Sequence, residues 1–300
     1  MTLSGPWTQL GMPSLPSNHS LQSLLNKRLK RQLPVIHSNI EERIYWDEDY
    51  FSLPSCRLYQ AATDTERLEI LADCNQQLMK EATTIEKAGM AYSAKMSLLA
   101  ESSQERMIYS LFAADEATHF HGLSLFLEKT VCDEEQPFLS FLSQLIDHGE
   151  KGELIFTIQV ILEGWGLTHY RRLAESCQNL ELRKVLQLIL RDEVSHHNSG
   201  LVLVADSSWT SSTTQKILET LTVFLNMVRC GPLGVVNSFE KVLGDLSRKQ
   251  KHELLNQLKS EQQSAIRLEL LKNLMGEKSE LIHKLKSRDC FRPLRPEESV

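Results

Sequence analysis

The chain has 300 residues, of which 41% are hydrophobic, and its 33 basic and 39 acidic side chains give a net charge of −6. It therefore has enough apolar residues for a large buried core, and it lacks the basic excess typical of nucleic-acid-binding proteins, so we expect no nucleic-acid partner. The longest apolar stretch, 154–167, contains Glu163 and is too short to span a bilayer, so we expect no membrane helix. The six cysteines form no Cys-x-x-Cys pair and the N-terminus lacks a signal-peptide pattern, so we expect a cytoplasmic protein.

Residues 1–62 are predicted to form an N-terminal arm and a leading segment. Prolines at positions 6, 13, 16 and 34 interrupt the beginning of the chain and leave one short helical candidate at 21–32. The basic run 27–31 fits either a solvated helix face or a docking site for an acidic partner, and the solvated face is favoured because charge runs are usually exposed. We assign this arm no function.

Residues 63–206 carry the pattern of a helical bundle. Thr63 and Glu66 form a capping box before a long helix with apolar residues at helical spacing, and Ser102 and Glu105 form another before a helix predicted over about 103–130. A short amphipathic segment, 138–146, then follows a proline. Helices over about 153–176 and 180–205, separated by the N-cap candidate Asn179, complete two hairpins joined by a crossover.

The C-terminal third is predicted to add further helices. Residues 207–287 contain helical patterns at 214–229 and 233–246 and one long amphipathic helix at 249–286. These helices either flank the bundle or contact a second subunit, so a homodimer is one expectation. Residues 288–300 contain two prolines, end in acidic residues and are predicted to be a mobile tail.

One motif occurs twice in the bundle. The sequence Asp-Glu-Ala-Thr-His at 115–119 recurs 77 residues later as Asp-Glu-Val-Ser-His at 192–196, and both Glu116 and Glu193 have another glutamate 30 residues upstream, Glu86 and Glu163. A Glu and a His three residues apart share a helix face. If the chain turns midway through the 30 residues, each helical arm of about 15 residues is about 22 Å long, and the chain returns to the height at which it began.

The equal spacings predict a two-metal site whose ligands are Glu86, Glu116, His119, Glu163, Glu193 and His196. Glu163 supports this prediction because it interrupts an apolar run, where an unpaired carboxylate would be costly. The alternative is a helical bundle whose buried glutamates and histidines bond only to each other.

These motifs resemble the ferritin-like di-iron carboxylate superfamily, which includes bacterial multicomponent monooxygenases, ribonucleotide reductase small subunits, acyl-carrier-protein desaturases, aldehyde-deformylating oxygenases and rubrerythrins. The resemblance covers about half the chain and is greatest to the monooxygenases. It implies an all-α, ferritin-like four-helix bundle with a crossover between helices 2 and 3 and additional C-terminal helices. It also implies one iron at Glu86, Glu116 and His119, a second at Glu163, Glu193 and His196, and bridging by Glu116 and Glu193. Asp115 and Asp192 are then expected to accept the second N–H of the metal-bound imidazoles.

The ligand types favour two iron ions per chain, with a manganese–iron pair as an alternative, and the lack of thiolates argues against structural zinc or an iron–sulfur cluster. The resemblance implies an O2-dependent monooxygenase or hydroxylase of a small or medium organic substrate, acting through a peroxo or high-valent intermediate and reduced by a ferredoxin or reductase. Iron oxidation and storage or peroxide scavenging is the alternative. N-oxygenation, desaturation and aldehyde deformylation are further alternatives within the superfamily.

Several neighbours of the predicted ligands discriminate between these branches. Leu123 occupies the position where ribonucleotide reductase small subunits commonly carry a radical tyrosine, and Ile189 the position of an additional metal histidine in arylamine N-oxygenases. Tyr109 and Tyr170 fit either redox or hydrogen-bonding roles or plain packing. Mid-helix glycines cost about 1 kcal/mol relative to alanine, so Gly89 and Gly166 indicate either a cavity beside the metals or close helix contacts. The cavity would hold substrate or O2.

Overall fold

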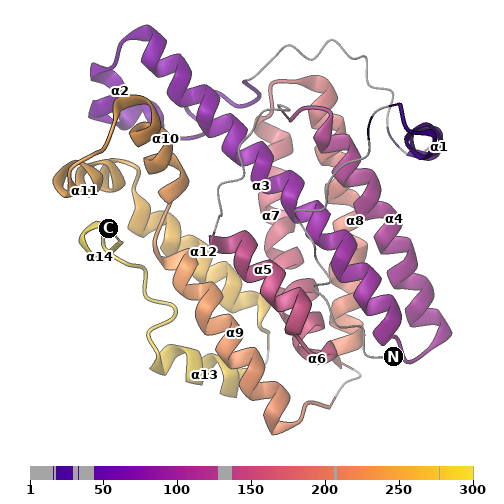
Figure 1. The fold of residues 1–300 in the computed structure, drawn as a ribbon. Helices are drawn as coiled ribbons and strands as arrows, with labels where there is room; N and C mark the ends of the chain where they lie inside the picture. The colour runs from indigo at the N-terminus through magenta and orange to yellow at the C-terminus, as the bar shows by residue number, and fades with distance from the viewer. Residues whose placement is uncertain are drawn as a thin grey trace.

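A computed structural model describes residues 16, 18–29, 33, 44–127, 137–205, 208–276 and 278–299. Over these ranges the protein is helical and contains no β-strand, which confirms the all-α prediction (Figure 1). Within the predicted arm and leading segment, residues 1–15, 17, 30–32 and 34–43 lie outside the described residues. Its short helix is described as α1, Ser20–Leu29.

Two helical hairpins form the bundle. The first is α3, Asp64–Leu99, with α4, Ser103–Ser124, and the second is α7, Glu163–Ser176, with α8, Leu180–Ala205. The helices of each hairpin pack together, and α4 also packs against α8. In Figure 1 these four long helices lie side by side. The predicted caps are present, since Thr63 and Ser102 each accept from the N–H three residues on, and Asn179 Oδ1 accepts from the N–H groups of residues 181 and 182.

The segment between the hairpins differs from a simple loop. Helix α5, Pro137–His148, packs against α3, and Lys95 donates to the backbone carbonyl oxygens of Ile146 and Gly149 at 2.6 and 3.0 Å. This lysine satisfies carbonyl groups at the end of α5 that the helix itself leaves without donors. The predicted helix at 103–130 ends earlier, at Ser124, and residues 128–136 lie outside the described ranges.

The predicted α-helix at 153–176 contains a change of helix type. After α6, Lys151–Leu154, residues Ile155–Leu162 form a π-helix, η2, that leads directly into α7. A π-helix holds more residues per turn than an α-helix, so it changes which side chains share a face with Glu163. Apolar periodicity cannot predict this, because the residues of η2 are nearly all apolar and mostly buried.

Two apolar cores occupy the two ends of the bundle. One contains Met96, Phe112 and Ile161, and the other contains Met79, Leu123 and Leu186. The leading segment closes the second core, where Tyr45 and Trp46 are each 1% exposed. Along each bundle helix, the predicted ligands lie between residues of one core and residues of the other.

The remaining helices cover the side and one end of the bundle, and Figure 1 shows α10 beside the N-terminal end of α3. They are η1 Leu53–Ser55, α2 Arg57–Ala61, α9 Ser211–Arg229, α10 Leu233–Leu243, α11 Arg248–Gln257, α12 Ser260–Leu274, α13 Ser279–Ser287 and α14 Pro296–Ser299. The prediction of a single long helix at 249–286 is wrong. Left-handed backbone at Lys259 (φ 53°) and Gly276 (φ 58°) divides this segment into α11, α12 and α13.

Residues 288–299, the described part of the predicted tail, pack against the rest of the chain. Cys290 is fully buried, Pro296 is buried, and the N–H of Leu294 donates to the carbonyl oxygen of Arg229 at 3.2 Å. Among the described residues, none of the helices combines the length and the apolar character needed to cross a bilayer.

Candidate metal centre

The structure brings all six predicted ligands into two overlapping groups. In each group the potential ligand atoms all lie within 4.8 Å of one another, and Glu193 belongs to both. The first group is Glu86, Glu116, His119 and Glu193, and the second is Glu163, Glu193 and His196. Each of the four bundle helices supplies part of this set, so the centre depends on both hairpins being folded together.

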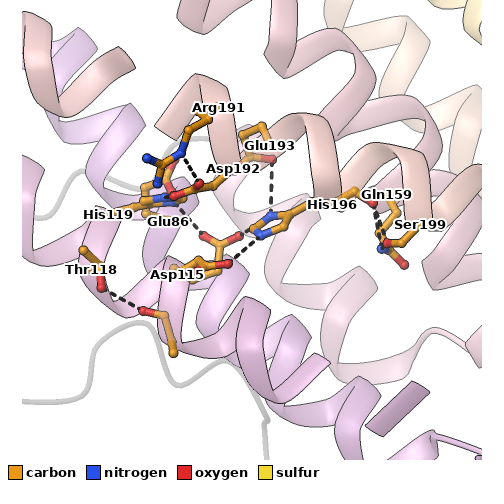
Figure 2. Close-up of polar contacts among 12 residues, drawn as sticks. Glu86, Asp115, Thr118, His119, Gln159, Arg191, Asp192, Glu193, His196 and Ser199 are labelled. Carbon is orange, nitrogen blue, oxygen red and sulfur yellow. Dashed lines mark hydrogen bonds and ion pairs between the residues drawn. The ribbon is translucent and has the colours of Figure 1, made fainter. Parts of the chain in front are cut away.

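The two histidines are held crosswise between the hairpins. Nε2 of His119 on α4 lies 3.3 Å from Asp192 on α8, and Nε2 of His196 on α8 lies 3.4 Å from Asp115 on α4 (Figure 2). Asp115 on α4 contacts His196 on α8, and His119, four residues later on α4, contacts Asp192, four residues earlier on α8. The two helices therefore run antiparallel. Each Asp-Glu-x-x-His motif therefore orients the imidazole of the other.

This arrangement leaves one nitrogen of each imidazole for a metal. In a neutral imidazole whose Nε2–H donates to the aspartate, the lone pair is on Nδ1. Nδ1 of His119 lies 3.0 Å from Glu86 Oε2, and Nδ1 of His196 lies 3.3 Å from Glu116 Oε1 and 3.6 Å from Glu193 Oε2. Both nitrogens thus face the carboxylates of the centre.

Two buried polar atoms in the centre lack a hydrogen-bond partner in the described chain. They are Glu163 Oε2 and His196 Nδ1, the second of which is close to two carboxylates without a well-directed hydrogen bond to either. Buried polar atoms in proteins are nearly always paired, so a pair of unsatisfied ligand atoms in one cluster indicates that a further group binds there. A metal cation fits both atoms, since one is a carboxylate oxygen and the other an imidazole nitrogen.

Electrostatics agree with a cation site. Burial, and then the charge of Glu86, raises the pKa of Glu116 to about 8, while burial and the charge of Glu193 raise the pKa of Glu163 well above its usual range. Burial opposes a charged His119, but hydrogen bonds to Asp192 and Glu86 outweigh it and raise the pKa of His119 to about 10. The four carboxylates are too close to be charged together without protons or metal ions to compensate them.

Gly89 makes room for a ligand. A Cβ at this position would lie 2.4 Å from Oε2 and 2.6 Å from Cδ of Glu116, far inside van der Waals contact. The carboxylate of Glu116 therefore occupies the space that any other residue at position 89 would fill. The two roles predicted for this glycine are a cavity beside the metals and a close helix contact. The geometry agrees with the second, because the space beside Gly89 on α3 is filled by Glu116 of α4.

The other predicted neighbours have different surroundings. Tyr170 donates a short hydrogen bond to Oε1 of Glu86, and Tyr109 donates to Gln159 Oε1 at 2.7 Å. Leu123 is fully buried in the second core. Apart from its two chain neighbours and the adjacent backbone of α7, no described atom lies within 4 Å of a Cβ built on Gly166, so this side of the helix is open.

A buried hydrogen-bond network around Gln159 was not predicted from the sequence. Gln159, in the middle of η2, accepts from the hydroxyls of Tyr92 and Tyr109 and donates to the backbone oxygen of His196 and to Ser199. The network fixes the π-helix against α8 directly beside a candidate ligand. The signal for it is present in the sequence, because Gln159 is a polar residue inside an apolar run.

The comparisons with known proteins do not add to this geometry. The chain matches no protein-family model, no curated protein sequence and no solved structure. The functional interpretation therefore rests on the residues and their arrangement.

Proposed function

We propose that this protein is an O2-dependent di-iron oxidoreductase with a ferritin-like bundle, acting as a monooxygenase or hydroxylase of an organic substrate. The observation that carries the proposal is the convergence of four carboxylates and two imidazoles, from four helices, on one buried centre. Two helices each supply an Asp-Glu-x-x-His motif and two each supply a glutamate, which is the ligand pattern of carboxylate-bridged metal pairs in helical bundles.

The donor set favours iron. Carboxylates with one imidazole per metal suit iron or manganese, and no cysteine of the described chain belongs to either ligand group. Two divalent cations would also balance the charge of four carboxylates. The unpartnered Glu163 Oε2 and His196 Nδ1 would gain a partner from the second metal.

Each residue then has a defined task. Glu86 and His119 would hold one iron, Glu163 and His196 the other, and Glu116 and Glu193 would lie between them. Asp115 and Asp192 keep the imidazoles in the tautomer that presents Nδ1. A bound di-ferrous pair would supply two electrons for O2 activation, with one oxygen atom going to the substrate and the other to water, and a ferredoxin or reductase would return the two electrons.

The surroundings support chemistry that excludes water. Apolar cores flank the ligand set at both ends of the bundle, and Glu86, Glu116, His119, Glu193 and His196 are each at most 5% exposed. A low-polarity environment strengthens the electrostatic interactions within the centre. It also limits access of bulk water to the reacting atoms.

The proposal is tested by metal analysis followed by O2 uptake. Protein reconstituted anaerobically with Fe2+ is expected to hold two irons per chain and, with a reductant and substrate, to consume O2 in proportion to oxidised product. Glu163→Ala and His196→Ala should lose iron and activity. Glu175→Ala removes an exposed glutamate from the same helix as Glu163 and should retain both. Loading of many irons without product would instead support storage, and failure to bind iron would contradict the proposal.

A further inference from the structure

A second group of charged side chains lies outside the metal centre, between α3, α7 and α12. It consists of Arg172 and His169 on α7, Arg267 on α12, Glu81 on α3, and Tyr50 in the leading segment, and we call it the cationic cluster. These residues come from four parts of the chain, and their charges act on one another. None of them is used by the metal centre.

Arg267 has no anionic partner among the described residues. Its side chain is half-buried, its hydrogen bond to Gln263 is long at 3.4 Å, and within the described chain no carboxylate lies within the 4.0 Å of an ion pair. Burial, and then the like charge of Arg172, lowers the pKa of Arg267. A guanidinium in this setting is costly to the fold, because buried charges are normally paired.

Arg172 is exposed, and Tyr50 holds its guanidinium in place. Its guanidinium donates to the backbone oxygen of Tyr50 at 3.0 Å and lies over the Tyr50 ring, 4.6 Å from the ring centroid. Stacking and one backbone hydrogen bond leave further N–H donors of this arginine available.

The cluster is positive overall at neutral pH. Burial, and then the charges of Arg267 and Arg172, lower the pKa of His169 to about 4, so this histidine is neutral. Glu81 supplies one negative charge at most, since burial raises its pKa while Arg267 acts in the opposite direction. The two arginines therefore exceed the acid by at least one charge, which a monoanion would balance.

Helix α7 carries residues of both the cluster and the metal centre. Glu163, Gly166 and His169 follow one another at three-residue intervals, so Gly166 lies between the other two along the helix and about 60° around its axis from each of them. The space over Gly166 is open to 4 Å, and the His169 ring lies 5.7 Å from that of Tyr170, which donates to Glu86. Six residues along an α-helix rise about 9 Å along its axis, which is the axial separation of His169 from Glu163 on α7.

We infer that the cationic cluster binds the carboxylate of an organic acid, whose carbon chain lies over Gly166 and extends toward the metal centre. The planar fork of a guanidinium matches a carboxylate, and two such groups with one excess charge select a monoanion. The substrate class is therefore a small or medium carboxylic acid. The oxidation of this acid rests on the proposed function, whereas its binding does not.

Calorimetric titration of the full-length protein tests the binding without iron or O2. The probes are hexanoate, octanoate, decanoate and benzoate, each compared with its uncharged primary amide. At least one carboxylate should bind tenfold or more tightly than its amide. Arg267→Gln should lower the affinity for that carboxylate by about tenfold to a hundredfold, which is the loss expected for hydrogen bonds between charged groups. It should leave the affinity for the amide unchanged.

Matched variants separate binding from folding. Arg171→Gln removes the same charge from an exposed neighbour of Arg172 and should bind the carboxylate as the unmodified protein does. Arg267→Lys keeps the charge but loses the paired donors, so its affinity should fall between those of the unmodified protein and Arg267→Gln. If Arg267→Gln does not fold, Arg267→Lys and Arg172→Gln provide the same comparison.

The outcomes distinguish this inference from the proposed function. Equal affinity for acids and amides, no binding of any probe, or an equal loss in Arg171→Gln would overturn the carboxylate site even if the protein is a di-iron oxygenase. Arginine-dependent carboxylate binding in a protein that takes up no iron would preserve the site and overturn the oxygenase.

Discussion

The substitution Gly89→Ala adds one methyl group against the carboxylate of a candidate metal ligand. The added Cβ would lie 2.4 Å from Glu116 Oε2, about 1 Å short of ordinary van der Waals contact at 3.4 Å. The carboxylate must therefore move by about this amount. Metal–ligand distances tolerate only about 0.2 Å, so Glu116 can no longer occupy the same position relative to a metal pair.

The effects on folding and on metal binding should be opposite. Alanine favours a helix interior by about 1 kcal/mol relative to glycine, and the displaced atoms are the far end of a flexible side chain, so metal-free Gly89→Ala should unfold at equal or higher urea concentration. Its affinity for metal should fall by at least tenfold, since even changes outside the ligand set cost about 10- to 100-fold.

The assay combines urea unfolding of the metal-free protein with a competitive Co2+ titration against a chelator. Gly234→Ala is the matched control, because no atom lies within 4 Å of a Cβ at that position on α10. It should leave Co2+ affinity unchanged. A Gly89→Ala protein that loses 2 kcal/mol or more of metal-free stability and keeps its Co2+ affinity would refute this reasoning and assign Gly89 to helix packing.

Three further predictions concern the surroundings of the centre. Tyr170→Phe removes the donor to buried Glu86 and should lower the metal-free unfolding free energy by about 1.5–3 kcal/mol in urea; an unchanged midpoint would contradict the hydrogen bond. Gln159→Leu removes the acceptor shared by two buried phenols. Because these phenols also hydrogen-bond to each other, one of them is left without an acceptor, and the change should cost about 1–3 kcal/mol in the same assay; an unchanged midpoint would show that the network is dispensable. The metal-free protein should lose stability from pH 6 to 9. In the folded protein the pKa of Glu116 is about 8 and that of His119 about 10, so both groups hold their protons more tightly than in the unfolded chain. Bound protons therefore stabilise the folded state at lower pH, and this stabilisation is lost as the protons are released. Metal binding displaces the same protons and should strengthen over that range in Co2+ titrations, and a metal-free stability that rises with pH would contradict the assigned protonation.

The sequence predicted the parts of the centre that depend on local spacing. Thr63, Ser102 and Asn179 begin the helices that were expected, and the 30-residue intervals place Glu86 and Glu163 opposite their partners. Helix caps and helical periodicity are short-range properties, so they can be identified in a single chain.

The features that were missed arise from contacts between distant segments. The π-helix η2 and the Gln159 network depend on how an apolar segment packs against α8, and apolar periodicity does not specify that contact. The division of 249–286 depends on left-handed backbone at Lys259, a residue type that rarely adopts it. The unpaired Arg267 depends on residues from four segments, so no local pattern marks it.

The most direct test of the metal centre is anomalous X-ray scattering at the iron edge from crystals prepared anaerobically with Fe2+. We expect two peaks about 3.5–4 Å apart, one beside Glu86 and His119 and one beside Glu163 and His196, with Glu193 in contact with both. Absence of iron, or a single iron outside these side chains, would contradict the two-metal centre and leave a bundle whose buried glutamates and histidines bond only to each other.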